Sequence, residues 1–364
     1  MDWIRMNIER YSEAHQIELG RSLLGRRKIY LDACFWIVLR DVELGRRTGT
    51  VERKLLHFLR RGVFAGKLIC PISVSMFSEL MKQPYTSTRR RATAQLIDEL
   101  SLGVSMVDSR LLLSTEIKLF LQNMKAEDAL HTMQELIWTK VAHILGVQYS
   151  LIPSAVLGGE PPKDMFDYVW QHSLVALVDA VGDAKMPHND YSRLSNETNA
   201  QNRQYRDELK SFKITYDIEL RGLIELVGAI AADVLVHFAS REVGEIPVPI
   251  PQQRAESVNA CKNILYYSMK KAEYRSALRT LHVQASLYAA MRWDKERKFK
   301  PNDFYDFEHA TAALTYCDAF LTESPLHILV TRPQIDLEQV NGCRVISDLD
   351  LAVEFVRTVA REPF

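Results

Sequence analysis

Short apolar runs recur near both ends of the chain, each bounded by polar or turn-forming residues. They span four to six residues, which is the length of a buried strand rather than of a helix. The expected strands are 28–32, 67–72, 104–108, 319–322 and 343–347. Helical spacing of apolar residues accompanies them at 51–62, 86–101, 305–316 and 348–359. Strands that alternate with helices predict an α/β fold with a mainly parallel sheet covered on both faces.

The middle of the chain has a different pattern, because helical periodicity recurs there without any run typical of a strand. The expected helices are 110–124, 127–146, 164–181, 203–239 and 254–292. Residues 182–204 are rich in Asn, Asp and Ser, which predicts an exposed loop. Residues 245–251 alternate proline with aliphatic residues, which predicts an extended segment.

These patterns predict one α/β domain that draws on both ends of the chain. Residues 1–27 form a helical lead-in, 28–109 and 293–364 together form the α/β domain, and 110–292 form an all-helical insertion. The insertion therefore interrupts a single domain rather than separating two domains.

Composition narrows the class of protein. The chain of 364 residues is 47% hydrophobic, which is enough for a substantial core. It carries 46 basic and 46 acidic residues, so no overall charge attracts nucleic acid, and any such contact must come from local basic clusters. The five cysteines include no CxxC pair, which argues against a zinc site and against a disulfide framework.

The sequence predicts neither a secretion signal nor a membrane span. The N-terminus, Met1-Asp2-Trp3-Ile4-Arg5, contains no apolar signal region, so a cytoplasmic location is expected. The most apolar stretch, 223–239, is interrupted by Glu225, Asp233 and His237, and it is expected to be a buried helix.

Two carboxylates occupy positions that an α/β fold uses for ligands. Asp32 follows the strand that ends in Tyr30-Leu31, and the carboxyl ends of parallel strands meet at the edge where open sheets bind ligands. Taken alone, Asp32 is typical of a residue that caps the next helix. Glu79 is a polar residue in an apolar stretch. Taken alone, it fits the exposed face of a helix as well as it fits the role of a ligand.

A second group of acids accompanies the helix expected at 305–316. Asp303 and Asp306 are three residues apart, as in a pair that caps a helix start. His309 follows one turn later, and a lone His there is more typical of a packed residue than of a ligand. Glu323 ends the strand 319–322. Gathered together, such carboxylates are the hard oxygen ligands that Mg²⁺ or Mn²⁺ prefers.

The order of these residues resembles that of the PIN-like nuclease superfamily. In that family, the first strand ends in Asp, and a helix after the second strand carries Glu. A further Asp opens a helix of small residues. That helix leads to a strand that ends in Thr followed by an acid. The matching positions are Asp32, Glu79, Asp306, Thr322 and Glu323. The resemblance covers roughly 28–108 and 303–360. It implies a three-layer α/β/α fold, to which the large helical insertion is foreign.

The position of the fourth acid is open. That family usually has an Asp two residues after the Thr, where this chain has Ser324. Glu323 and Asp318 are the two candidates to replace it.

The resemblance implies a metal-dependent phosphodiesterase, most often an endoribonuclease, in which a metal activates water. The expected catalytic residues are Asp32, Glu79, Asp306 and Glu323, and the expected ligands of Mg²⁺ or Mn²⁺ are Asp32, Glu79, Asp303 and Asp306. RNA is the expected substrate, with DNA as the alternative. The insertion is a candidate surface for a second copy of the chain or a protein partner.

Two other functions stay open. A phosphatase that uses a strand-end Asp as nucleophile requires a second Asp two residues later, where this chain has Cys34. The second is a degenerate PIN-like protein that binds RNA or protein without catalysis. The large helical insertion and the open position of the fourth acid are consistent with it.

Overall fold

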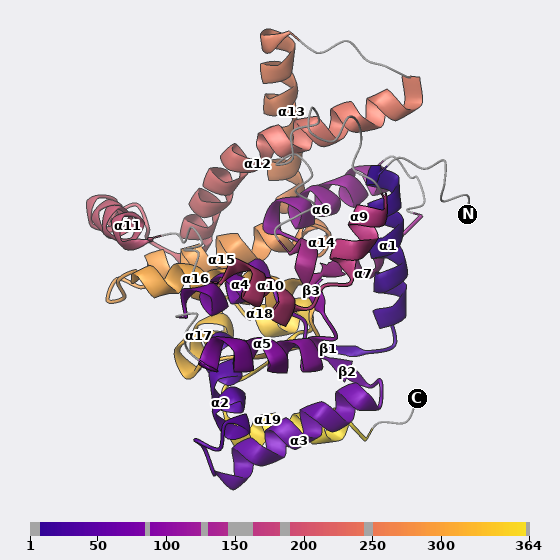
Figure 1. Cartoon of the computed structure of the whole chain (residues 1–364). Helices are drawn as coiled ribbons and strands as arrows, with labels where there is room; N and C mark the ends of the chain where they lie inside the picture. The colour runs from indigo at the N-terminus through magenta and orange to yellow at the C-terminus, as the bar shows by residue number, and fades with distance from the viewer. Residues whose placement is uncertain are drawn as a thin grey trace.

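The computed structural model describes residues 8–83, 88–124, 130–144, 163–182, 190–243 and 250–361. Its centre is a four-stranded sheet in the order β2-β1-β5-β6, with every pair parallel. The strands are β1 (Arg27–Leu31), β2 (Leu68–Ile69), β5 (Ala319–Leu321) and β6 (Arg344–Ile346). The expected parallel sheet is confirmed, and its strands come from both ends of the chain (Figure 1).

Helices cover both faces of the sheet because successive strand residues point to opposite sides. Ile29 and Leu31 belong to one core, and Tyr30 and Phe320 belong to the other. The first core is completed mainly by α2 (Ala33–Glu43), α3 (Thr50–Phe64), α4 (Val74–Lys82), α5 (Thr88–Ser101) and α19 (Leu349–Val359). The second is completed mainly by α15 (Arg279–Trp293), α16 (Pro301–Tyr316), α17 (Ser324–Val330) and α18 (Leu337–Asn341).

The third expected strand lies outside the parallel sheet. β3 (Val104–Met106) pairs antiparallel with β4 (Trp138–Lys140), and a single bridge between Ile72 and Ser105 links this pair to the segment after β2. The prediction of a middle without strands is therefore wrong at β4. Three residues are too few to show the alternation by which a strand is recognised, and the fully buried Trp138 is held by its tertiary contacts.

The prediction of a helix over 127–146 is also wrong for 130–144, the part of that range that the structure describes. The chain forms the short α7 (Met133–Leu136), then β4, then a 3₁₀ turn at Val141–His143. The first helix, α1 (Ile8–Leu23), packs beside α7 and β4. The segment 164–181 is likewise divided, into α9 (Lys163–Trp170) and α10 (Leu174–Val181). Leu174 and Val178 of α10 pack in the same core as Ile29 of the sheet.

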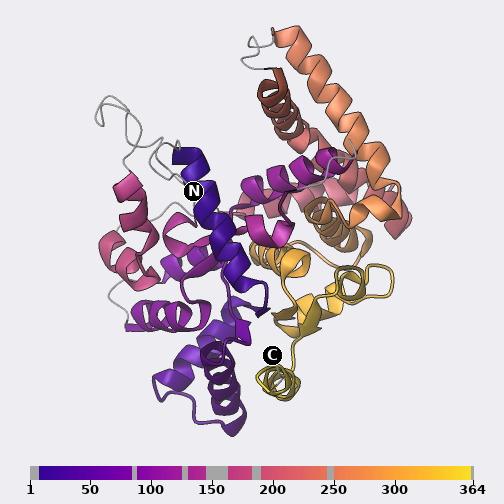
Figure 2. The same cartoon turned by 90° about the vertical axis from the view of Figure 1, so that its right-hand side faces the viewer.

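A third core holds the remaining helices together. It is formed by α6 (Ser109–Met124), α12 (Phe212–Val243), α13 (Pro251–Met269) and α14 (Ala272–Arg275), with one face of α15. α12 and α13 run side by side and project away from the sheet (Figure 2). α15 joins the two parts, because Leu281 lies in the helical core and Leu287 in the core above the sheet.

Two further expectations about the middle are corrected. Residues 192–204, expected in a loop, form α11 (Ser192–Gln204), while 183–189 lie outside the described residues, as do 244–249 of the expected extended segment. The apolar stretch 223–239 is only partly buried, since Leu226 is 76% exposed. Among the helices of the described residues, none has both the length and the apolar character needed to cross a membrane.

Candidate active site

Asp32 is fixed at the carboxyl edge of the sheet by three hydrogen bonds. Its backbone N–H donates to Leu321 O of the neighbouring strand at 3.0 Å. Its carboxylate accepts from the N–H of Ala33 at 2.6 Å through Oδ1 and from the hydroxyl of Thr322 at 2.7 Å through Oδ2. Asp32 therefore caps α2, as its sequence position alone suggested, and it also presents a charge at the edge where α/β sheets bind ligands.

Glu79 and His309 face each other across two helices. Glu79 lies on α4 and its side chain is 19% exposed, whereas His309 on α16 is fully buried. His309 Nε2 is 2.9 Å from Glu79 Oε2. An ionised carboxylate only accepts hydrogen bonds, so Nε2 carries the proton in this pair. His309 therefore orients the carboxylate of Glu79.

A chain of buried hydroxyl groups holds the other side of His309. Nδ1 lies 2.7 Å from the hydroxyl of Tyr30, which lies 2.6 Å from Ser73 Oγ, which in turn lies 2.7 Å from Ser75 Oγ. All of these side chains are buried. The network ties β1 and the start of α4 to α16, so the three elements that carry Asp32, Glu79 and His309 are connected directly.

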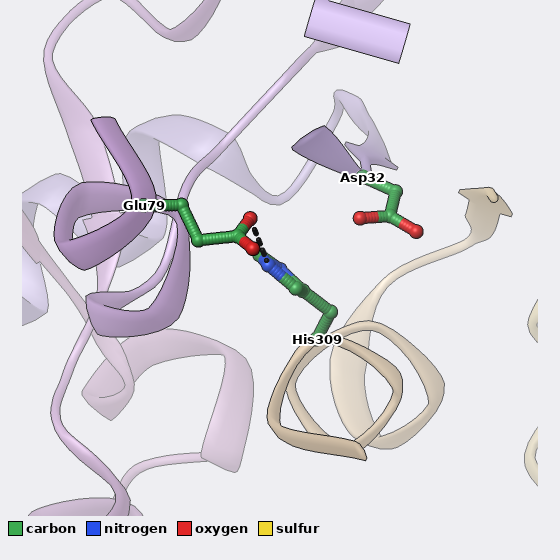
Figure 3. A group of neighbouring side chains, drawn as sticks. All are labelled: Asp32, Glu79 and His309. Carbon is green, nitrogen blue, oxygen red and sulfur yellow. Dashed lines mark hydrogen bonds and ion pairs between the residues drawn. The ribbon is translucent and has the colours of Figure 1, made fainter. Parts of the chain in front are cut away.

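The ligand atoms of Asp32, Glu79 and His309 all lie within 4.8 Å of one another. Figure 3 shows the three side chains converging from the end of β1, from α4 and from α16. Two of the predicted site residues thus share one site. His309, which the sequence pattern favoured as a packing residue, completes the group. Its spacing of one helical turn from Asp306 was the one available signal.

Asp306 and Glu323 lie close enough to Asp32 to be affected by its charge. Burial, together with the charges of Asp32 and Glu323, raises the pKa of Asp306 to about 7. Partial desolvation of its carboxyl and the charge of Asp32 also raise the pKa of Glu323. Repulsion between neighbouring carboxylates is the electrostatic condition that a bound cation relieves.

The charge of His309 responds to the same group of acids. Burial alone would lower its pKa, but the hydrogen bond to Glu79 and the charge of Asp32 outweigh burial and raise the pKa above its usual value. The imidazole therefore partly neutralises the carboxylates that surround it.

Asp303 and Asp318 have other partners. Asp303 Oδ2 accepts from the N–H of Lys300 at 2.7 Å and so caps α16, and Oδ1 is 3.8 Å from Arg297. Asp318 precedes β5 and accepts from the N–H of Lys28 at 2.7 Å. It lies at the opposite edge of the sheet from Asp32, which leaves Glu323 as the acid at the edge of the site.

The cysteines add no chemistry to this edge. Cys70, Cys261, Cys317 and Cys343 are buried and free, while Cys34 is half-buried. Burial and the nearby charge of Asp32 raise the pKa of the Cys34 thiol, which keeps it protonated. Tyr30 and Trp36, the aromatic residues next to Asp32 in the sequence, are buried and contribute to the core, so neither offers a face to a base.

Searches of protein-family models, of curated proteins and of solved structures return no match for this chain. The geometry and chemistry of this site are therefore the basis for a proposed function.

The hydroxyl chain provides a test of how the site is assembled. Replacing Tyr30 by Phe leaves His309 Nδ1 and Ser73 without the shared partner, and an unsatisfied buried polar group costs about 1–3 kcal/mol. We expect the free energy of unfolding of Tyr30→Phe, measured by urea denaturation, to fall by about that amount. Tyr267→Phe is the matched control, because Tyr267 is 68% exposed and should tolerate the change. Equal stability of the two variants would contradict the network.

Proposed function

We propose that this chain is a phosphodiesterase that depends on a divalent metal ion and hydrolyses RNA. The observation that carries the proposal is the convergence of Asp32 and Glu79, together with His309, at the carboxyl edge of the parallel sheet. Asp306 and Glu323 add two acids whose pKa values are raised by their neighbours. The PIN-like order of these residues supports phosphodiester chemistry and RNA as the substrate.

The donor set fits Mg²⁺ or Mn²⁺. Because Nε2 of His309 carries a proton toward Glu79, the imidazole offers no lone pair there, and the ligands are carboxylate oxygens. Sites made only of oxygen ligands suit Mg²⁺ and Mn²⁺. Asp32 and Glu79 would hold the ion. When bound, it would activate water and neutralise charge on the phosphate.

The residues of the chain supply positioning and proton transfer. Ala33 N and Thr322 fix the carboxylate of Asp32, and His309 fixes that of Glu79, so neither acid has to reorganise before it binds. Burial, which an ion held by Asp32 and Glu79 would not remove, is the largest cause of the raised pKa of Asp306, so its carboxyl exchanges a proton at a higher pH than an ordinary Asp. It is our candidate for the group that exchanges protons with the reacting water or the leaving oxygen.

One observation favours a second candidate function, a PIN-like module that binds its partner without catalysis. His309 already pairs with Glu79, and an imidazolium at this position would neutralise the acids in place of a metal ion. The two functions differ in whether the protein binds the cation.

Thermal melting in Mn²⁺ against chelator distinguishes them. If the site binds Mn²⁺, the free energy of unfolding should rise by about 2.7 kcal/mol at a free ion concentration one hundred times the dissociation constant. Glu79→Gln should lose most of this increase. Glu18→Gln, which alters an exposed carboxylate on α1, should keep it. No stabilisation of the wild type by Mn²⁺ or Mg²⁺ would favour the non-catalytic module.

Activity on a generic phosphomonoester tests the phosphatase alternative. We expect cleavage of RNA in Mn²⁺ and none of p-nitrophenyl phosphate, because Cys34 stands where that class requires a second Asp. Hydrolysis of the phosphomonoester without cleavage of RNA would overturn the proposal.

A further inference from the structure

A small pocket lined with cations lies where α11 meets the loop between α15 and α16. Its volume is about 70 Å³, far below the roughly 300–1,000 Å³ of pockets that hold drug-sized ligands. Asn199, Asn202 and Asp294 line it. The other lining residues are all cationic: Arg203, Arg206, Arg292, Lys295, Arg297 and Lys298.

Acidic neighbours do not balance these cations. Asp294 accepts two hydrogen bonds from Arg332, and Arg292 pairs with Glu219. Within the described residues, Arg203, Arg206 and Lys298 form no ion pair. Burial and the charges of Arg206 and Arg292 lower the pKa of Lys295, and the charge of Asp207 offsets them only in part. An anion in the pocket would relieve the repulsion between these cations.

Hydrogen bonds hold the pocket rigidly in place. The side-chain amide of Asn199 donates to the carbonyl of Phe299 at 2.8 Å and accepts from its N–H at 2.9 Å. Asn202 Oδ1 accepts from Arg292 Nε at 2.7 Å. These bonds fasten the polar α11 to α15 and to the loop after it. The cations therefore sit on a fixed framework rather than on a free helix end, which lowers the entropy cost of binding.

The pocket is connected to the candidate active site through the first turn of α16. Arg297, one of its lining residues, lies 3.8 Å from Asp303. His309 follows Asp303 by six residues on the same helix, a distance of about 9 Å along the helix axis. The pocket therefore lies beside the N-terminal turn of the helix that carries His309.

We propose that this pocket binds a backbone phosphate of the RNA strand that the acids of the sheet edge would cut. The proposal rests on the proposed function for the identity of the strand as RNA. Its physical basis is independent, because a phosphate supplies the anion that Arg203, Arg206, Lys295 and Lys298 lack. Phosphate contacts of this kind position a strand without reading its sequence.

The test measures binding of a short, unstructured, fluorescein-labelled RNA by anisotropy, with EDTA present so that cleavage plays no part. The variant is the full chain with Arg203→Gln and Lys298→Gln, two exposed residues whose loss should leave the fold intact. The control is Arg53→Gln with Lys54→Gln, which removes the same charge from exposed positions on α3. Melting curves verify that both proteins are folded.

We expect the pocket variant to bind RNA roughly 25-fold more weakly than wild type at about 0.1 M salt. The slope of log affinity against log salt should decrease in magnitude by about 1.4, which corresponds to two lost contacts with a single strand. The control should bind like wild type.

Equal loss of RNA affinity in both variants would mean that any removed positive charge has this effect, and it would overturn the proposal. A wild-type protein that binds no RNA would also overturn it. A different outcome would separate the two proposals. If only the pocket variant loses RNA binding and the protein binds no metal at Asp32, the proposed catalysis is refuted but the phosphate pocket is supported.

Discussion

Asp32→Asn is expected to abolish RNA cleavage in Mn²⁺ while the protein stays folded. Asn keeps the shape of the side chain and caps α2 about as well as Asp, but it removes the charge that would hold the metal. Changes to groups that only orient a metal ligand typically cost 10–100-fold, so loss of the ligand itself should exceed about 100-fold. The measurement is the initial rate of cleavage of a labelled RNA, with chelator as the blank.

The effect on stability should be small because two terms oppose each other. Asp32 uses both oxygens, one for Ala33 N and one for Thr322 Oγ1, and Asn has a single acceptor. The lost hydrogen bond costs about 1 kcal/mol, while relief of repulsion with Asp306 offsets it. Unfolding of Asp32→Asn would favour a purely structural role for this residue.

Thr322→Val is the matched control for this experiment. It removes the same hydrogen bond from Oδ2 of Asp32 but keeps the carboxylate, so we expect cleavage to fall by about 10–100-fold rather than to vanish. If Thr322→Val were as inactive as Asp32→Asn, the orientation of Asp32 would be the decisive property and not its charge.

Substitutions of the two acids of α16 should differ in their effect on cleavage. Asp306→Asn should also abolish cleavage, because it removes the group proposed to exchange protons. Asp303→Asn should be milder, since Asn still accepts from Lys300 N at the helix start. Equal activity of wild type, Asp32→Asn, Asp306→Asn and Asp303→Asn would rule out this site for the nuclease.

The second large effect is expected at Glu116, far from the acids of the sheet edge. Its fully buried carboxylate accepts from Thr280 N at 3.1 Å and from Thr280 Oγ1 at 2.9 Å. The hydroxyl of Tyr316 donates to it at 2.5 Å. Glu116 thereby joins α6 of the helical core to α15 and to the end of α16. Burial raises its pKa from 4.5 to about 7.

We expect Glu116 to make the free energy of unfolding depend on pH. Its folded pKa lies above its unfolded pKa, so its stabilising contribution is fully present below about pH 4.5 and is lost as pH rises through about 7. The loss is about 3 kcal/mol, from the difference between the two pKa values. Urea denaturation of wild type and Glu116→Gln across this range measures it.

Glu116→Gln should remove this pH dependence, because Gln stays neutral throughout. Glu18→Gln, at an exposed position, should follow the wild-type curve. A wild-type curve parallel to that of Glu116→Gln would mean that Glu116 titrates as an ordinary carboxyl, and that the link between the two parts of the protein is not sensitive to pH.

Local patterns in the sequence were sufficient to predict the parallel sheet and to place two acids along it. That these two acids share one site was expected from the PIN-like order of the residues and not from either segment alone. Asp32 follows a short apolar run, and Glu79 is a polar residue in an apolar helix, so each could be placed by the periodicity of its own segment. Asp306 was expected at the start of a small-residue helix, whereas α16 begins at Pro301 and Asp306 lies in its second turn. The placement of Asp32 and Glu79 needed only the direction of a strand or helix and its buried face.

Tertiary structure alone decided the features that join distant segments. The pair His309–Glu79 spans 230 residues, and its chemistry appears only when α4 and α16 pack together. β4 is three residues long and becomes a strand only because β3 offers it a partner. No window of the sequence contains both members of these pairs.

α11 illustrates the same limit most clearly. Its sequence is polar on every side, so no apolar stripe predicted a helix between Ser192 and Gln204. Asn199 and Asn202 hold it through hydrogen bonds to Phe299 and Arg292, about ninety to one hundred residues later. Hydrophobic periodicity reveals where a segment buries its own surface. A segment held by polar contacts with distant partners carries no such signal, because its stability resides in the pairing and not in the segment.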